Sequence, residues 1–146
     1  MSASLTYVSS PLPESTILAV REFTGQEAAA YQWWAESLNF FDDPKRPGQL
    51  VGNTKLFRLI DDPAADSFMA SADMDRIVGA LEAASARFGV EWQLFLQDTP
   101  VGIITGGRRD EKAGKAVKGL LAICEMMGVD PAELDRNRIL KEYPPR

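Results

Sequence analysis

The residues with the clearest chemical potential are Gly106-Gly107-Arg108-Arg109, which stand directly before a segment with helical periodicity. Glycines let a backbone approach a ligand closely, and a helix N-terminus offers free N–H groups and a positive dipole. Two arginines add donors suited to phosphate or carboxylate. With Lys112 they predict an anion site. Because both glycine-rich phosphate motifs are absent, the competing interpretation is a tight turn followed by a solvated basic face.

Catalytic groups are scarce in this chain. It has no histidine and a single cysteine, Cys124. The lack of histidine excludes His-based triads, His–Cys dyads and most catalytic zinc sites. Cys124 lies at the centre of an apolar helical stripe, which indicates a core position rather than a nucleophile. We therefore assign no catalytic residue, no metal ligand and no cofactor, and favour a protein that is not an enzyme.

Acidic side chains gather in the first half of the chain, in loops between residues 42 and 75. The spacing of these aspartates lacks the EF-hand pattern, so a solvated loop with helix-capping aspartates is the simpler interpretation. Carboxylates on such loops also suit contact with a basic protein partner. The candidates for this contact are Asp61, Asp62 and Asp66.

Aromatic side chains suggest a second contact surface. A capping box at Thr24 predicts a helix over Gly25–Phe41. At 100° per residue, one side of this helix carries the predicted core stripe of Tyr31, Trp34, Leu38 and Phe41. Trp33 and Phe40 fall on a different side. A helix that is apolar on two sides is either enclosed in the core or binds a partner, and tryptophan is enriched at binding hot spots.

Periodicity and breakers predict the elements that position these residues. Alternation and β-branched residues predict strands at Leu5–Val8, Ser15–Phe23, Thr54–Ile60, Val90–Gln97 and Val101–Thr105. For the second of these a helix is the alternative. The main helices are expected at 25–41, at 73–88 and from Asp110 to Gly128, followed by a turn capped by Asp130 and a short docking segment, Arg136–Tyr143.

A chain of 146 residues suits one domain. The element order predicts an α+β fold, with an antiparallel or mixed sheet of four or five strands and three main helices packed mostly on one face. Residues 141–146 are expected to form a frayed tail. No apolar run reaches the length of a membrane span. The absence of a signal-like N-terminus and the single cysteine favour a reducing cytoplasm.

Charge decides between the function classes. The net charge is −5, with 14 acidic and 7 basic side chains in residues 1–100. This balance argues against nucleic acid as a partner. We expect a non-enzymatic protein-binding module of the inhibitor, immunity or adaptor type, and a homo-oligomer is compatible with the sequence. The alternative is a binding protein or transferase that holds phosphate, a nucleotide or a coenzyme A-like ligand at Gly106–Lys112.

Overall fold

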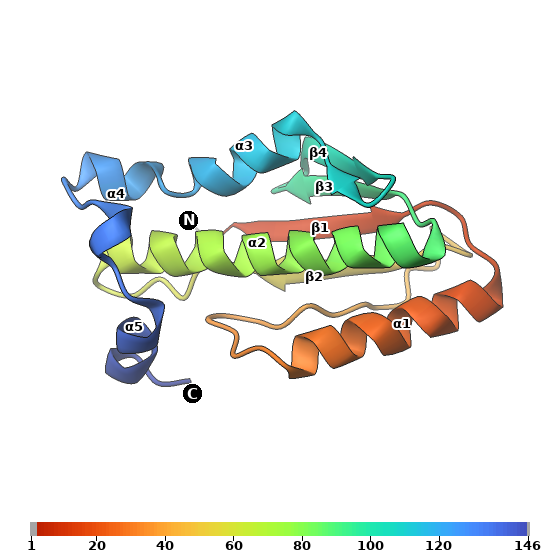
Figure 1. Ribbon diagram of the computed structural model, residues 1–146, viewed down its shortest axis with the longest axis horizontal. Coiled ribbons are helices and arrows are strands. Elements are labelled where there is room, and N and C mark those ends of the chain that lie inside the picture. Colours follow the sequence, from red (N-terminus) through yellow and green to blue (C-terminus); the bar gives the residue numbers. More distant parts are fainter. Residues whose placement is uncertain (1–2, 146) are drawn as a thin grey trace.

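The computed structural model describes residues 3–145, and its central element is a β-sheet (Figure 1). Its five strands are antiparallel and lie in the order β2-β1-β3-β4-β5. Their bounds are Ser4–Ser9 (β1), Val51–Lys55 (β2), Trp92–Leu96 (β3), Thr99–Thr105 (β4) and Arg108–Arg109 (β5). The predicted α+β fold is confirmed, and the sheet is wholly antiparallel. The first strand in sequence lies between β2 and β3.

The helices form a layer over one face of this sheet, as predicted. Their bounds are Glu14–Ala29 (α1), Pro63–Phe88 (α2), Glu111–Gly119 (α3), Ala122–Met126 (α4) and Arg136–Glu142 (α5), with a 3-10 turn at Pro131–Glu133 (η1). The long helix α2 runs along the sheet, with α1 on one side of it and α3 on the other (Figure 1). Within residues 3–145, no helix has the length and apolar character required to cross a membrane.

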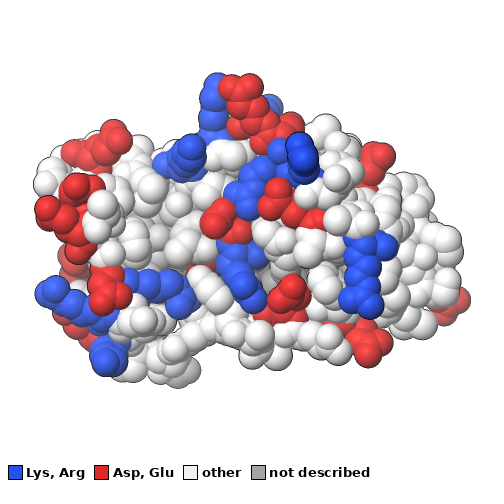
Figure 2. All heavy atoms as spheres, in the orientation of Figure 1, with Lys and Arg blue, Asp and Glu red and all other residues white. Residues whose placement is uncertain are grey.

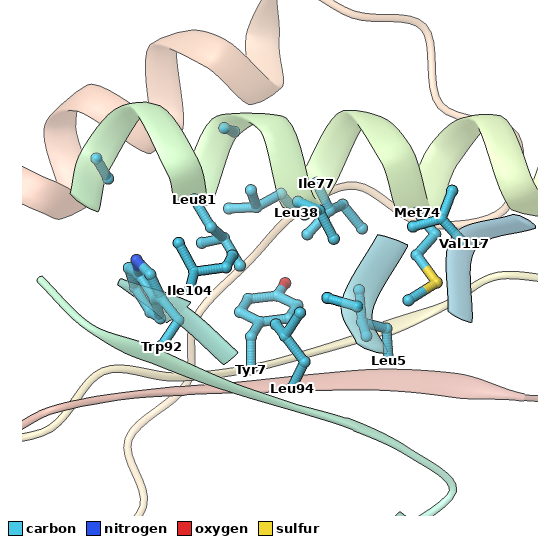
Figure 3. Packing of buried hydrophobic residues seen from close by; sticks show 14 of the residues in the cluster. Leu5, Tyr7, Leu38, Met74, Ile77, Leu81, Trp92, Leu94, Ile104 and Val117 are labelled. Atoms are coloured by element: carbon cyan, nitrogen blue, oxygen red, sulfur yellow. The ribbon is translucent and has the colours of Figure 1, made fainter. Parts of the chain in front are cut away.

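The core lies between α2 and the sheet. Alternate strand side chains project from β1 and β3 toward α2, among them Tyr7, Leu94 and Trp92 (Figure 3). They meet Ile77 and Leu81 on the helix, and all five of these side chains are at most 1% exposed. The inward position predicted for Trp92 is confirmed. Burying an apolar side chain of this size contributes about 1.5–3 kcal/mol, so this layer is the main source of stability.

The first helix differs from our prediction. The strand expected at Ser15–Phe23 is absent, and the helical alternative for this segment is confirmed: α1 starts after Pro13 and ends at Ala29. The helix predicted over 25–41 is wrong. Proline has a fixed φ and lacks an N–H group, which suits a helix start and outweighs the β-branched residues that follow. Thr24 is not an N-cap. Its hydroxyl donates to the carbonyl of Val20 at 2.7 Å, one turn earlier in the same helix.

Residues 30–50 connect α1 to β2 without a helix because their backbone groups bond to other elements. The N–H of Trp34 donates to Asp73 on α2 at 2.9 Å, and the N–H of Asn39 donates to the Tyr7 hydroxyl at 3.0 Å. Trp34 and Leu38 are still buried, at 3% and 5% exposure. The core assignment of these two side chains is confirmed, although the helix that implied it is wrong. The other two members of the predicted stripe are not core residues, since Tyr31 is half-buried and Phe41 is 45% exposed.

Two further helices have different bounds from those predicted. Helix α2 begins at Pro63 rather than at residue 73, and the Asp62 carboxylate caps it by accepting from the N–H of Ala65 at 3.2 Å. Proline at the first helical position supports this early start. The predicted third helix divides near Gly119 into α3 and α4. Its N-cap is confirmed, since Asp110 accepts from the N–H of Ala113 at 2.8 Å.

The second strand also lies earlier than predicted, at Val51–Lys55 instead of Thr54–Ile60. Its position depends on Gly52, whose backbone faces Tyr7 across the β1–β2 pair. A Cβ at Gly52 would lie 2.0 Å from the Tyr7 ring and 2.3 Å from the carbonyl oxygen of Asn39. Only glycine fits there, and this contact sets the β1–β2 register.

The last segment docks against the N-terminal part of α2. Asp130 caps η1 by accepting from the N–H of Ala132 at 2.9 Å, as predicted. Ile139 and Leu140 of α5 are each 6% exposed and pack in a second cluster with Trp34. We expected residues 141–146 to fray. In the structure α5 continues to Glu142, while residue 146 lies outside the described residues.

Candidate functional site

The residues Gly106 and Gly107 form a tight hairpin turn rather than the entrance to a helix. Their φ angles are 57° and 80°, in the left-handed region that a two-residue hairpin loop requires. The chain then adds the short strand β5, with Arg108 opposite Thr105 and Arg109 opposite Ile104. The glycine pair is therefore separated from the N-terminus of α3 by a strand.

Arg109 is engaged within the fold. Its guanidinium donates to Asp75 at 2.6 Å and to Glu82 at 2.8 Å, both on α2. The hydrogen bond with Glu82 raises the pKa of Arg109 further above its ordinary value. On the face of the molecule seen in Figure 2, basic and acidic side chains lie next to one another. Arg108 and Lys112 are exposed on β5 and α3, so the five predicted anion ligands do not converge on one site.

The acidic candidates have separate roles in the structure. Asp61 is exposed and accepts from the Tyr143 hydroxyl at 3.5 Å, and Asp62 is the exposed N-cap of α2. Asp66 is only 4% exposed. Its carboxylate accepts from three donors at 2.8–2.9 Å: Trp34 Nε1 and the N–H groups of Arg58 and Leu59. Asp66 therefore fixes the loop before α2 and presents no surface to a partner.

Trp33 and Phe40 do not share a surface, because α1 ends before them. The Phe40 ring is stacked on Trp92, with centroids 5.9 Å apart, and meets Tyr7 edge-on at 5.8 Å. It therefore extends the core. Trp33 is half-buried and lines a surface hollow at the other end of this irregular segment.

This hollow, which we call the Trp groove, is built from Trp33, Trp34, Phe57 and Arg58 and has a volume of about 300 Å³. The Arg58 guanidinium lies over the Trp34 ring, 4.3 Å from its centre. Sequence reasoning missed Phe57 and Arg58 as site residues, since the strand predicted at 54–60 places them in a sheet. The alternation of polar and apolar residues in 54–60 gives no indication that the backbone after Lys55 is irregular.

A buried carboxylate, Asp73, joins α2 to α5 beside this groove. Asp73 is 0% exposed and lies 3.8 Å from the guanidinium of Arg136. Desolvation raises the pKa of Asp73 to about 6 and that of the neighbouring Tyr31 to about 12. The Arg136 guanidinium also lies 4.2 Å from the centre of the Tyr31 ring. The group ties three segments together, whereas the sequence placed Asp73 only at the start of a predicted helix.

The sheet face that points away from α2 has a separate character. Strand register places Asn53, Thr6 and Phe95 in one row across β2, β1 and β3. A second row runs from Val51 and Val8, which are each only 3% exposed, to Gln93 and Ile103, and Ile103 is 45% exposed. We call these two rows the open sheet face. Next to it lies a hollow of about 330 Å³, whose lining includes Ile103, Thr105 and Gln49.

Charge is nearly absent from this face. The five strands contain no Asp or Glu, whereas the whole chain has 21. The basic strand residues are Lys55, Arg108 and Arg109, and Arg109 turns toward the helices. Lys55 and Arg108 belong to β2 and β5, the two edge strands. The centre of the open sheet face is therefore uncharged in an acidic molecule.

Cys124 is buried, and its thiol donates to the carbonyl of Ala64 at 3.3 Å. Burial raises the pKa of this thiol, consistent with the predicted core position. Among residues 3–145, no group of three or more His, Cys, Asp or Glu side chains is arranged to hold a metal ion. Comparisons with protein-family models, curated proteins and solved structures found no match for this chain.

Proposed function

We propose that the chain is a protein-binding module of the inhibitor or adaptor type, which contacts its partner through the open sheet face. The observation that supports this proposal is the separation of charge. All 21 acidic residues lie outside the strands, while the centre of the face carries Phe95, Ile103 and uncharged polar side chains. Interface centres are depleted of charge and surrounded by a polar rim, which is the arrangement found here.

The dimensions of the face indicate how far the contact extends. Strands lie about 4.8 Å apart and rise about 3.3 Å per residue, so five short strands span roughly 20 Å by 17 Å. This area, about 350 Å², is less than half of the roughly 800 Å² that each partner contributes to a standard interface. The partner must therefore also cover flanking segments, and the hollow beside Ile103 and Gln49 is the adjoining surface.

Electrostatics favours a basic partner at the encounter stage. The net charge of −5 attracts a basic protein over a distance comparable to the Debye length, about 8–10 Å at physiological ionic strength. Close contact then removes the apolar face from water, which contributes roughly 25 cal/mol for each Å² of apolar area buried. Charge therefore governs the association rate, and the sheet face governs the lifetime of the complex.

Site-specific cross-linking tests this proposal in the organism that makes the protein. A photo-reactive phenylalanine is placed at Ile103 in one version of the full chain and at Leu18 in another. Leu18 is a matched control because it is 62% exposed on α1, which belongs to the helical layer. We expect one protein to be cross-linked from position 103 and not from position 18.

Substitution gives a second readout of the same contact. Ile103→Arg should reduce capture of the cross-linked protein at least tenfold, whereas Leu18→Arg should leave it unchanged. Equal cross-linking from both positions, or no cross-linking from position 103, would show that the open sheet face is not the binding surface.

A further inference from the structure

Residues 143–145 run along one side of the Trp groove, although they are distant in sequence from the other residues that form it. Tyr143 packs edge-on against Trp34, with ring centroids 6.1 Å apart, and Pro145 is part of the groove lining. About 300 Å³ of open space remains beside them. The segment therefore forms one side of the groove through Pro145 and leaves the rest open.

Arg58 holds the backbone of this segment. Its guanidinium donates to the carbonyl oxygen of Tyr143 at 2.7 Å and to that of Pro144 at 3.1 Å. The same guanidinium lies over the Trp34 ring, and this contact orients the Arg58 N–H groups independently of the carbonyls that they bind. Two N–H groups in a rigid fork thus donate to two consecutive carbonyls, and this one contact does not itself distinguish between side chains.

These contacts are suited to proline. Proline has no N–H group, so a Pro-Pro run offers carbonyl acceptors and no backbone donor that would need a partner. An extended run of this kind has no internal hydrogen bonds and loses little entropy on binding. Aromatic-lined grooves recognise such runs in several peptide-binding domains. Here the half-buried rings of Trp33 and Phe57 provide aromatic walls, and Arg58, which lies over the buried Trp34 ring, provides the donors.

The position of residues 143–145 allows them to be released from the Trp groove. Pro144 and Pro145 are exposed, whereas Ile139 and Leu140 of helix α5 are buried in the second cluster, against which Tyr143 also packs. Release of residues 143–145 therefore costs the contacts of Tyr143 with this cluster but leaves Ile139 and Leu140 in place. We propose that the Trp groove binds an aromatic–Pro–Pro segment of a partner protein, and that Tyr143–Pro145 occupies the groove in cis until such a segment displaces it.

This site is separate from the open sheet face and does not depend on the proposed function. The test uses the full chain and a synthetic peptide that copies residues 141–145, Lys-Glu-Tyr-Pro-Pro, with an amide end. Binding is followed through the indole N–H resonances of Trp33 and Trp34. A variant with Pro144→Ser and Pro145→Ser should bind the peptide about tenfold more tightly than the natural chain, because occupation in cis lowers the apparent affinity by the fraction of free grooves.

Three controls identify the source of the binding. A peptide with serines in place of both prolines should not bind. Arg58→Lys keeps the charge but loses the two-point donation, so peptide affinity should fall at least tenfold, with the amide spectrum showing that the fold is retained. Ile103→Arg, on the open sheet face, should leave peptide affinity unchanged.

Three outcomes would overturn the inference. The first is unmoved indole resonances when the double serine variant is mixed with millimolar peptide. The second is equal affinity for the proline and serine peptides. The third is equal affinity of the natural chain and the double variant, which would show that Tyr143–Pro145 does not compete for the groove.

Discussion

Protonation of Asp73 should be visible in the stability of the fold. The carboxyl is fully buried, and desolvation raises its pKa from 3.8 to about 6 in spite of the N–H of Trp34 and the guanidinium of Arg136. The folded state therefore binds the proton more tightly than the unfolded chain. The resulting stabilisation is complete below about pH 4 and is lost as the pH rises through 6. A shift of about two units corresponds to about 3 kcal/mol.

The perturbation is Asp73→Asn, which keeps the shape of the side chain and removes the titration. The free energy of unfolding of both proteins is measured by urea denaturation at several values between about pH 4 and pH 7. Across this range the natural chain should lose about 3 kcal/mol relative to the variant. The buried neighbour Met74→Leu is the control, because neither side chain titrates and its effect should be the same at every pH.

Two results would refute this reasoning. A difference between the natural chain and Asp73→Asn that stays constant with pH would show that the carboxyl does not titrate differently in the two states. A natural chain that gains stability over the variant as the pH rises would show that Arg136 and Trp34 outweigh desolvation and lower the pKa of Asp73.

Three further perturbations follow from the packing. Gly52→Ala should lower the free energy of unfolding, measured by urea denaturation, by at least about 2 kcal/mol, because its Cβ would lie 2.0 Å from the Tyr7 ring. The control Gly25→Ala meets open space in α1 and should raise it by about 0.5–1 kcal/mol. Equal effects of the two substitutions would contradict the close contact at Gly52. Tyr7→Phe should cost about 1–3 kcal/mol because the hydroxyl bonds both backbone groups of Asn39, and an unchanged midpoint would contradict this. The thiol of Cys124 should react with a thiol reagent only as fast as the chain unfolds, and rapid reaction without denaturant would show that α4 opens locally.

The elements that were predicted correctly are specified by neighbouring residues. Alternation in 90–97 fixes which side chains of β3 face the core, and Trp92 lies where that pattern places it. Asp110 and Asp130 cap the segments that directly follow them. In each case the physical cause, a two-residue period or a side chain that reaches an N–H two or three residues on, lies within a few residues of sequence.

The errors concern segments whose structure is decided at long range. Residues 30–50 look helical by periodicity, but Trp34 and Asn39 donate their N–H groups to Asp73 and Tyr7. A local pattern contains no information about such distant acceptors. The early start of α2 is different, because Asp62 followed by proline is a helix-start pattern that the surrounding aspartates obscured.

The candidate sites show the same division. The Gly106-Gly107 turn was identified locally, but its connection to β5 moved Arg109 from a predicted ligand site into an ion pair with α2. The Trp groove was not predictable, because Arg58 finds its carbonyl partners 85 and 86 positions later. The open sheet face needed the strand order and register, which place Thr6 beside Phe95.

The position of β1 between β2 and β3 has a consequence for how the chain acquires its fold during synthesis. β1 is made first, yet its neighbours β2 and β3 begin only at Val51 and Trp92. Strand β1 must therefore stay unpaired on one edge until most of the chain has been translated, which favours slow, late closure of the sheet. In the strand order β1 is what joins β2 to β3, so a fragment without residues 4–9 would lack the pairing that connects β2 to β3–β5. Such a fragment and a separate β1 peptide should therefore reassemble when they are mixed, as the two parts of a split protein do.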